Sequence, residues 1–322
     1  MNTGISVCIA ARNEENNIEQ TVYSALKQDI PQTIELLVCA NGCTDSTEEI
    51  VKSIAKKDSR VRLLTSDPGK PCAWNTLMEE SKYDTIIFAD GDVILGKNSI
   101  NALVQFMDNQ NLIGASSKMK KIIKTPLDYI FSAPLTEPCV GGIVGRLYAI
   151  KKKEFVTEMA AKGYSKMPNN IICEDLWVSL ILEERKEGVV VRKRWGYCSD
   201  AVVLYQAPTS IDDYKTSKRN AKGAIQLERE HPQLGYLFSG KTIKEKVNFL
   251  AHKYYAIDNR QERIKKVITY FLRRMKPQHI INYIAHYHAR TEYDEGKCTN
   301  LWDIPLSTKE KLANQVISKY TH

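Results

Sequence analysis

Thr85-Ile86-Ile87-Phe88-Ala89-Asp90-Gly91-Asp92 is the stretch that decides the fold. Its first five residues form an apolar run that predicts a buried strand, and two carboxylates follow at the strand's exit. In an open α/β sheet, ligands bind beyond the carboxyl ends of the strands, where such acids can meet a divalent cation and phosphates. Asp-Gly is also a common turn dipeptide, so residues 90–92 taken alone are more typical of a turn than of a metal site.

The chain before this stretch alternates strands and helices. Apolar runs predict strands at residues 5–10, 34–40 and 61–64, and apolar residues at helical spacing predict a helix after each of them. Such alternation predicts a mostly parallel sheet joined by right-handed crossovers. The polar loops at 11–15, 41–45 and 90–92 then open at the same edge, which is the usual form of a nucleotide crevice.

Beyond Asp92 the alternation is looser. The pattern predicts helices at 100–107, 128–135, 153–162 and 211–230, and strands at 112–116, 146–150 and 189–191. The glycine-rich residues 141–145 lack the spacing of a dinucleotide fingerprint or a P-loop. A further helix is predicted from Glu174 to about residue 187, with Glu174 and Asp175 in its first turn. Acids there stabilise the helix dipole by about 0.3 to 1 kcal/mol without any other role, so a general base is one of two interpretations.

Composition indicates an ordinary folded protein. The 322 residues are 43% hydrophobic and 26% charged, with a formal net charge of +8 that suits an anionic ligand or an acidic membrane surface. The eight cysteines include no C-x-x-C pair, which favours a reducing compartment. With no signal peptide or membrane span in the sequence, we expect a cytoplasmic protein, and we expect no nucleic-acid partner.

A composition shift near residue 240 predicts two parts. Residues 1–239 form the predicted α/β domain, and residues 240–322 a basic, helical C-terminal extension. The apolar residues of the extension fit one helical face, so it either packs on the main domain or lies as a basic amphipathic helix on an anionic membrane. The second interpretation would make the protein peripheral at the inner face of the membrane.

Five motifs in order resemble family 2 glycosyltransferases, which have the GT-A fold, a Rossmann-like α/β architecture. The motifs are residues 6–15 (SVCIAARNEE), 38–45 (VCANGCTD), 69–75 (GKPCAWN), 90–92 (DGD) and 174–176 (EDL). The resemblance covers roughly residues 5–227. Each motif is weak alone, and their order and spacing make the match specific. Ala10 stands where the family usually has proline, and Asn41 where it often has Asp.

The resemblance implies a donor site for a nucleoside diphosphate sugar. Nucleotide-binding positions carried over from the family are Ala10, Arg12, Glu14 and Asn41 at the base and ribose, Lys70 near the diphosphate, and Asp90 at the ribose or a metal-bound water. Asp92, with Asp90, would bind Mg²⁺ or Mn²⁺, which neutralises the leaving diphosphate. A UDP-sugar is the expected donor, although the Asn41 amide can both donate and accept and so leaves the base less certain.

The resemblance also implies the chemistry. Asp175 would take the proton from the acceptor hydroxyl, Glu174 would support or orient it, and a single displacement would invert the anomeric centre. Processive members carry Q-x-x-R-W, of which only Arg219 is matched here, so we predict a nonprocessive enzyme that adds one sugar. Lys218, Arg219 and Lys222 contact the diphosphate or the acceptor, or else form a solvated helix face. The acceptor is a lipid, a glycan, a protein or a small molecule.

Two other functions remain open at this point. A noncatalytic module would bind a nucleotide sugar without turnover, and the retained Glu174-Asp175 pair argues against it. A nucleotidyltransferase would need a glycine-rich basic loop after the first strand, and Ala11-Arg12-Asn13-Glu14 is not such a loop.

Overall fold

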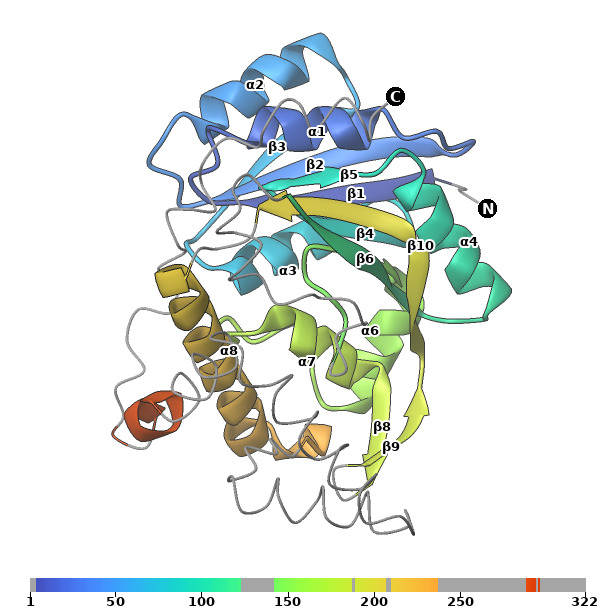
Figure 1. Cartoon of the computed structure of the whole chain (residues 1–322). Helices are drawn as coiled ribbons and strands as arrows, with labels where there is room; N and C mark the ends of the chain where they lie inside the picture. Colours follow the sequence, from blue (N-terminus) through green and yellow to red (C-terminus); the bar gives the residue numbers. More distant parts are fainter. Residues whose placement is uncertain are drawn as a thin grey trace, which may run out of the picture.

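A mixed eight-stranded sheet in the order β3-β2-β1-β4-β7-β6-β10-β5 forms the frame of the protein (Figure 1). The computed structural model describes residues 4–122, 142–186, 189–206, 210–236, 288–293 and 295. The strands of the sheet are β1 Gly4–Ala11, β2 Thr33–Asn41, β3 Val61–Ser66, β4 Thr85–Asp90, β5 Val93–Leu95, β6 Gly114–Ile122, β7 Leu147–Lys151 and β10 Trp195–Gln206. A separate two-stranded ribbon pairs β8 Glu183–Lys186 with β9 Val189–Lys193.

The first four strands are parallel, as the alternating pattern predicts. β1 lies between β2 and β4, with Ala10 opposite Asp90 in the register. β7 runs antiparallel to both β4 and β6, so its first residue enters the sheet at the edge where β1, β2 and β4 end. The chain before Leu147 is therefore brought to the same edge as Asp90.

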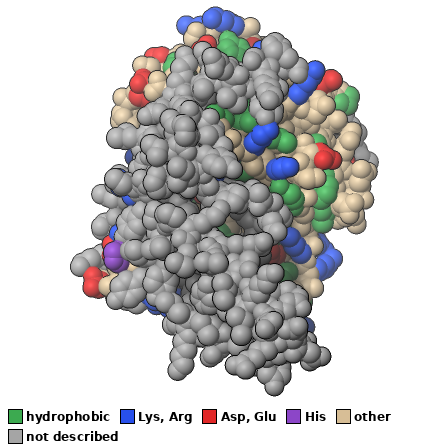
Figure 2. All heavy atoms as spheres, viewed as in Figure 1, with side chains coloured by type: hydrophobic (Ala, Val, Ile, Leu, Met, Phe, Trp, Pro, Cys, Tyr) green, Lys and Arg blue, Asp and Glu red, His purple; other side chains and the backbone are tan. Residues whose placement is uncertain are grey.

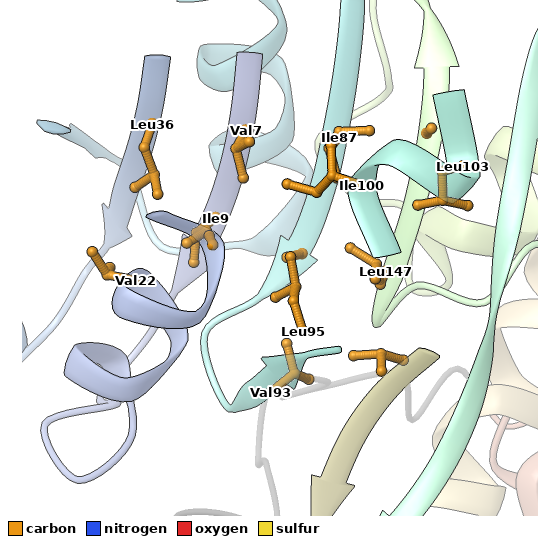
Figure 3. Close-up of a cluster of buried hydrophobic side chains, with 14 of the residues drawn as sticks. Val7, Ile9, Val22, Leu36, Ile87, Val93, Leu95, Ile100, Leu103 and Leu147 are labelled. Carbon is orange, nitrogen blue, oxygen red and sulfur yellow. The ribbon is translucent and has the colours of Figure 1, made fainter. Parts of the chain in front are cut away.

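Helices cover both faces of the sheet. They are α1 Ile18–Leu26, α2 Thr47–Lys57, α3 Lys70–Glu80, α4 Ser99–Asn109, α6 Lys152–Ala161, α7 Glu174–Ile181, α8 Ser210–Glu230 and the short 3-10 helix η1 Pro232–Leu234. α1, α2 and α4 pack on one face, where Val22, Ile100 and Leu103 lie against strand residues such as Ile9 and Ile87 (Figure 3). α3, α6, α7 and α8 pack on the other face, around Trp74 and Trp177.

Two predicted elements differ from the structure. The helix predicted from Glu174 to about residue 187 ends at Ile181, and residues 183–186 form β8 instead. Glu183 and its neighbours favour helix by intrinsic propensity, but pairing with β9 decides their conformation. The strand predicted at 112–116 lies at 114–122, and β5 and β10 had no counterpart in the prediction.

The C-terminal part is described only at residues 288–293 and 295. Residues 288–293 are helical, and Ala289 is buried against Ala221 and Ile225 of α8. This segment therefore packs on the main domain, which is the first of the two interpretations for the extension. The predicted helix at 128–135 and the rest of residues 240–322 lie outside the described residues, so the boundary at 240 stays a prediction.

Charged side chains of both signs are visible on the coloured part of the face in Figure 2. On the face shown in Figure 2, Lys and Arg side chains occur in several separate groups among Asp and Glu. The net charge of +8 therefore does not by itself name a partner. Within the described ranges, no helix is long and apolar enough to cross a membrane.

Candidate functional site

Asn41, the last residue of β2, ties three strand-end loops together. Its Nδ2 donates a hydrogen bond to the carbonyl oxygen of Ala11 at 2.9 Å, and its Oδ1 accepts one from the backbone N–H of Gly69 at 3.4 Å. Gly69 has a φ of +137°, a region that favours glycine, and α3 begins directly after it. Asn41 is buried, and its amide bonds to backbone at both ends. Its predicted contact with the nucleotide base remains a prediction.

The loop after β1 is pinned beside the Asp90–Asp92 turn. The backbone N–H of Glu14 donates to Thr47 Oγ1 at 2.7 Å, which fixes the loop to the start of α2. The side chain of Glu14 is buried, and a Cβ added to Gly91 would lie 3.0 Å from Glu14 Cγ and 3.2 Å from Ala11 Cβ. The two loops therefore lie in contact, as the predicted sheet edge required, and the glycine at position 91 permits the close approach.

Lys70 forms the centre of a buried ionic cluster. Its Nζ lies 2.7 Å from Asp90 Oδ1 and also pairs with Glu174 Oε1, so it joins the ends of β4 and α7. Burial alone would lower the pKa of Lys70, but the two carboxylates raise it well above its usual range. Burial likewise opposes ionisation of Asp90, yet Lys70 and then Arg146 hold the pKa of that carboxyl below its usual range. All three side chains are therefore assembled at one place, which the sequence predicted only for each residue singly.

Asp175 has a different environment from its neighbour Glu174. Asp175 Oδ2 accepts a hydrogen bond from the backbone N–H of Gly145 at 3.1 Å, and Oδ1 accepts one from Leu176 at 2.8 Å. Burial and the negative charge of Glu174 raise the pKa of Asp175 to about 6. A carboxyl group with a pKa near neutrality suits general acid–base chemistry, because it can both take up and release a proton at physiological pH.

The glycine-rich residues before β7 hold this carboxylate in place. The backbone N–H of Ile143 donates to Ser179 Oγ at 2.6 Å, and that of Val144 donates to Ser116 Oγ at 2.9 Å. A Cβ added to Gly145 would lie 3.1 Å from both Asp175 Oδ2 and Glu174 Oε1. The segment that gave only a weak signal in the sequence therefore supplies a backbone donor to Asp175, and its glycine at position 145 permits the close approach.

Arg146 is a site residue that the sequence did not indicate. Its Nη1 lies 3.9 Å from Asp92 Oδ1, and its guanidinium carbon lies 3.9 Å from the centre of the Tyr205 ring. The strand pattern at 146–150 assigned Arg146 to a strand, and only its position directly after the glycine-rich segment could have marked it. Stacking on Tyr205 fixes a planar cation beside Asp92 and Asp90.

Arg219 of α8 also reaches the site. A Cβ added to Gly223 would lie 2.3 Å from Cys173 Sγ, so α8 packs directly on the residue that precedes α7. The Arg219 guanidinium contributes to lowering the pKa of Asp90, and its buried Nε has no hydrogen-bond partner among the described residues. A buried donor of this kind fits an anionic ligand.

Lys218 and Lys222 have a different role from Arg219. Lys222 Nζ lies 2.6 Å from Glu292 Oε2, and Lys218 pairs with Glu292 Oε1. These two lysines therefore bind the C-terminal segment to α8. Of the three basic residues considered on this helix, Arg219 is the one with a buried and unsatisfied donor.

Asp92 and Asp90 offer part of a metal-ligand set. The described ranges contain no group of three or more His, Cys, Asp or Glu that could hold a metal ion. Mg²⁺ in phosphate-binding sites usually takes one or two carboxylates and completes its shell with substrate phosphates and water. Asp90 and Asp92 lie at the carboxyl end of β4, close to the buried Nε of Arg219 that can bind an anion. Two carboxylates in this position fit a metal that binds together with a diphosphate.

Residues 6–160 match the model of glycosyl transferase family 2. This stretch, just under half of the chain, belongs to the family. The match includes the residues from Ala10 to Asp92 and ends before Glu174, so the positions of Glu174, Asp175 and Arg219 rest on the geometry described above.

Curated glycosyltransferases are similar to parts of the chain. An uncharacterised glycosyltransferase of Haemophilus influenzae is 32% identical over 111 residues, 34% of this chain and 44% of that protein. The poly(ribitol-phosphate) β-N-acetylglucosaminyltransferase TarS of Staphylococcus aureus is 28% identical over 122 residues, 36% of this chain and 21% of that protein. The matched stretches thus span less than half the length of these curated relatives.

A solved structure confirms the predicted GT-A fold. The mannosyltransferase PcManGT of Pyrobaculum calidifontis, solved in complex with GDP-Man and Mn²⁺, is similar with a TM-score of 0.60 at 17% sequence identity. The similarity covers 93% of this chain and 87% of that chain. The mixed, mostly parallel sheet with helices on both faces is therefore the architecture of a family 2 enzyme.

Proposed function

We propose that this protein is a metal-dependent, inverting glycosyltransferase that moves one sugar from a nucleoside diphosphate sugar to an acceptor hydroxyl. The observation that carries the proposal is the carboxylate of Asp175, whose pKa is raised to about 6 beside the Lys70–Asp90–Glu174 cluster. A noncatalytic binding module has no use for a carboxyl group held near neutrality.

The donor diphosphate binds between the turn 90–92 and α8. Arg219 supports this placement, because its buried Nε lacks a partner, and Arg146 adds a second fixed guanidinium beside Asp92. Lys70 is the third cation; its ammonium has three N–H donors, and its two carboxylate partners, Asp90 and Glu174, leave one donor for the diphosphate. The base and ribose lie against Ala10, Arg12, Glu14 and Asn41, the residues that the family resemblance assigns to them.

Asp92, with Asp90, would hold Mg²⁺ or Mn²⁺. The metal supplies positive charge that stabilises the departing diphosphate. Mn²⁺ in the complex of the similar mannosyltransferase supports this expectation. Arg146 and Arg219 act on the same negative charge from the protein side, because both lie close enough to Asp90 to lower the pKa of its carboxyl.

Asp175 accepts the proton of the acceptor hydroxyl. The N–H of Gly145 orients the Oδ2 of Asp175, and Glu174, which is paired with Lys70, lies beside it as a supporting group. A direct attack on the anomeric carbon inverts its configuration and requires no covalent enzyme intermediate, in keeping with the family. The mismatch of residues 216–220 with Q-x-x-R-W supports transfer of a single sugar per acceptor.

A thermal-shift screen of nucleoside diphosphate sugars, with Mn²⁺ and with a chelator, tests the donor part of the proposal. A specific donor raises the unfolding temperature in proportion to ln(1 + [L]/Kd). UDP-sugars are the first probes, and GDP-mannose follows because the similar mannosyltransferase binds it. We expect a metal-dependent shift for one donor and its hydrolysis or transfer. Nucleotide affinity without turnover from any donor would favour the noncatalytic binding module.

A further inference from the structure

α8 packs directly on the residues that precede α7. The thiol of Cys173 donates a weak hydrogen bond to the backbone carbonyl of Asn220, with 3.8 Å between the sulfur and the oxygen. The backbone N–H of Ile172 donates to Gln226 Oε1 at 3.1 Å. The acidic first turn of α7 follows Cys173 directly, so the position of α8 is tied to the position of that turn.

The C-terminal segment, residues 288–293, packs on the other side of α8 (Figure 1). Its Ala289 is buried against Ala221 and Ile225 of α8. At about 3.6 residues per turn, these two positions point to the opposite side of the helix from Gly223, where an added Cβ would meet the residue that precedes α7. α8 is therefore held between the start of α7 and the C-terminal segment.

Glu292 of the C-terminal segment forms two ion pairs with α8. Its Oε1 pairs with Lys218, and its Oε2 lies 2.6 Å from Lys222 Nζ. Residues four apart lie one above the other on a helix face, so one carboxylate fixes the segment against a full turn of α8. Lys222 is only 6% exposed, and a buried ammonium needs an anionic partner, so the loss of Glu292 would disturb this turn.

Arg219 belongs to the same turn of α8 but faces the site. Its buried Nε has no hydrogen-bond partner among the described residues, and its positive charge helps to lower the pKa of Asp90. Three cations within five residues repel one another, and the charge of Glu292 offsets this repulsion. The two lysines are held on the C-terminal segment, which leaves the guanidinium of Arg219 on the side of the site.

We propose that Glu292 is a positioning residue for the donor diphosphate. By pairing with two lysines of α8, it fixes this helix and directs Arg219 to the turn 90–92. The inference rests on the proposed function, because that function places the diphosphate at Arg219. Glu292 is negatively charged and would repel a diphosphate, so it acts through α8 and not by contact. A cation that is ordered in advance binds its ligand at a lower entropic cost.

Titration calorimetry of the full chain with UDP and with GDP, each in the presence of Mn²⁺, tests the proposal. Glu292→Gln should weaken binding of whichever nucleotide binds the wild type roughly tenfold, because α8 is no longer fixed. Removal of a negative charge alone would strengthen binding of an anion, so weakening identifies a positioning role. Glu292→Asp keeps the charge and should recover most of the affinity.

A double-mutant cycle shows whether Glu292 acts through Arg219. Arg219→Met should weaken nucleotide binding roughly 10- to 100-fold by loss of a charge-assisted hydrogen bond. The double variant should bind no more weakly than Arg219→Met alone, because the residue that Glu292 positions is already absent. Glu80→Gln breaks an ion pair with Arg62 at the opposite end of the sheet, and this matched control should bind as the wild type does.

Several outcomes would contradict the proposal. Glu292→Gln could bind the nucleotide as tightly as the wild type or more tightly, the second because the released lysines bind the diphosphate themselves. Additive losses in the double variant would show that Glu292 does not act through Arg219. A wild type that binds neither nucleotide would remove the donor site together with this inference. Nucleotide binding without sugar transfer would contradict only the proposed activity, since the cycle reads binding alone.

The folding of each variant is checked by circular dichroism and by its unfolding temperature. If Glu292→Gln fails to fold, Lys218→Gln takes its place in the cycle, because it removes one ion pair and leaves the buried Lys222 paired. It should also weaken nucleotide binding, and this loss should disappear when Arg219 is already replaced by Met. An additive loss, or none, would contradict the positioning role.

Discussion

Glu35 and Glu174 are both buried carboxylates paired with cations, but they lie at opposite ends of the sheet and have different surroundings. At the start of β2, Glu35 Oε1 accepts hydrogen bonds from Ser6 Oγ at 2.6 Å and from the backbone N–H of Lys82 at 2.7 Å. Arg62 and Lys82 add positive charge at 3.9 and 3.7 Å from Oε2. Neutral donors therefore satisfy Oε1, and two cations balance the charge of the carboxylate from the side of Oε2, which has no hydrogen-bond partner among the described residues.

The cluster at the other end of the sheet has more carboxylates than cations. Asp90, Asp92, Glu174 and Asp175 lie there with Lys70, Arg146 and Arg219. Lys70 is shared by two carboxylates, and among the described residues no cation is ion-paired with Asp175, whose pKa Lys70 lowers without offsetting the effects of burial and Glu174. We therefore interpret Glu35, whose charge two cations balance, as a structural acid, and we propose that the acids crowded at the other end of the sheet are the reactive ones.

The largest expected effect is that of Asp175→Asn. Loss of the proton acceptor should lower the rate of transfer roughly 10²- to 10⁴-fold, as for other general bases. Release of nucleoside diphosphate in the presence of acceptor measures this rate. Glu35→Gln is the matched control, since it changes a buried acid at the structural end, and it should leave the rate unchanged. Equal rates in wild type and Asp175→Asn would exclude Asp175 as the base.

The second effect concerns the metal. Asp92→Asn should weaken binding of the donor in the presence of Mn²⁺ roughly tenfold or more, because a carboxylate ligand is lost. Titration calorimetry with and without Mn²⁺ measures it. Asp175→Asn should bind the donor with the metal dependence of the wild type, and a metal dependence that survives in Asp92→Asn would remove Asp92 from the ligand set.

The third effect is on the free energy of unfolding, which should depend more on the cation of the Asp90–Glu174 cluster than on a cation of the Glu35 cluster. Lys70→Met leaves Asp90 and Glu174 without their shared cation and should lower the free energy of unfolding by about 3 kcal/mol at pH 7, while Lys82→Met should cost less than about 1 kcal/mol. The Lys82 side chain is 62% exposed and that of Lys70 is 23% exposed.

The pH dependence of the Lys70→Met deficit follows from the pKa of Asp90, which Lys70 lowers in the folded protein. The ionised Asp90 stabilises the folded protein at pH values above the pKa that this carboxyl has in the unfolded chain, and this stabilisation is lost as the pH falls through its lower folded-state pKa. The loss of unfolding free energy caused by Lys70→Met should therefore become smaller in acid. Urea unfolding at several pH values tests this. A deficit equal to that of Lys82→Met at pH 7 would contradict the difference between the clusters.

The sequence predicted the features that leave a local pattern and missed those that depend on tertiary packing. The strands β1, β2 and β4 and the acids at their ends were predicted because parallel strands leave a strong local pattern. Arg146 was missed because it reaches the site through an antiparallel strand from a distant segment. The sharing of Lys70 by Asp90 and Glu174 was missed because it depends on how α7 packs on the sheet. β8 was predicted as helix because cross-strand pairing with β9, which leaves no local pattern, outweighs the propensity of residues 183–186, whereas β9 was predicted as a strand.

Among the substituted acids, the smallest effect is expected for Glu35→Gln. Its amide oxygen can still accept the hydrogen bonds from Ser6 and Lys82, so only the attraction to Arg62 and to the Lys82 ammonium is lost. The free energy of unfolding should fall by about 1 kcal/mol. A loss as large as that of Lys70→Met would show that the structural cluster is no better satisfied than the site.

The pH dependence of kcat/KM, measured for the wild type and Glu174→Gln, tests the central claim most directly. Asp175 must be ionised to accept a proton, so activity should be lost as pH falls through about 6, the value to which its pKa is raised. Burial and the charge of Glu174 are the causes of that shift, so Glu174→Gln should move the acid limb to lower pH. A rate that is constant through this range, or a limb that Glu174→Gln leaves in place, would contradict the account.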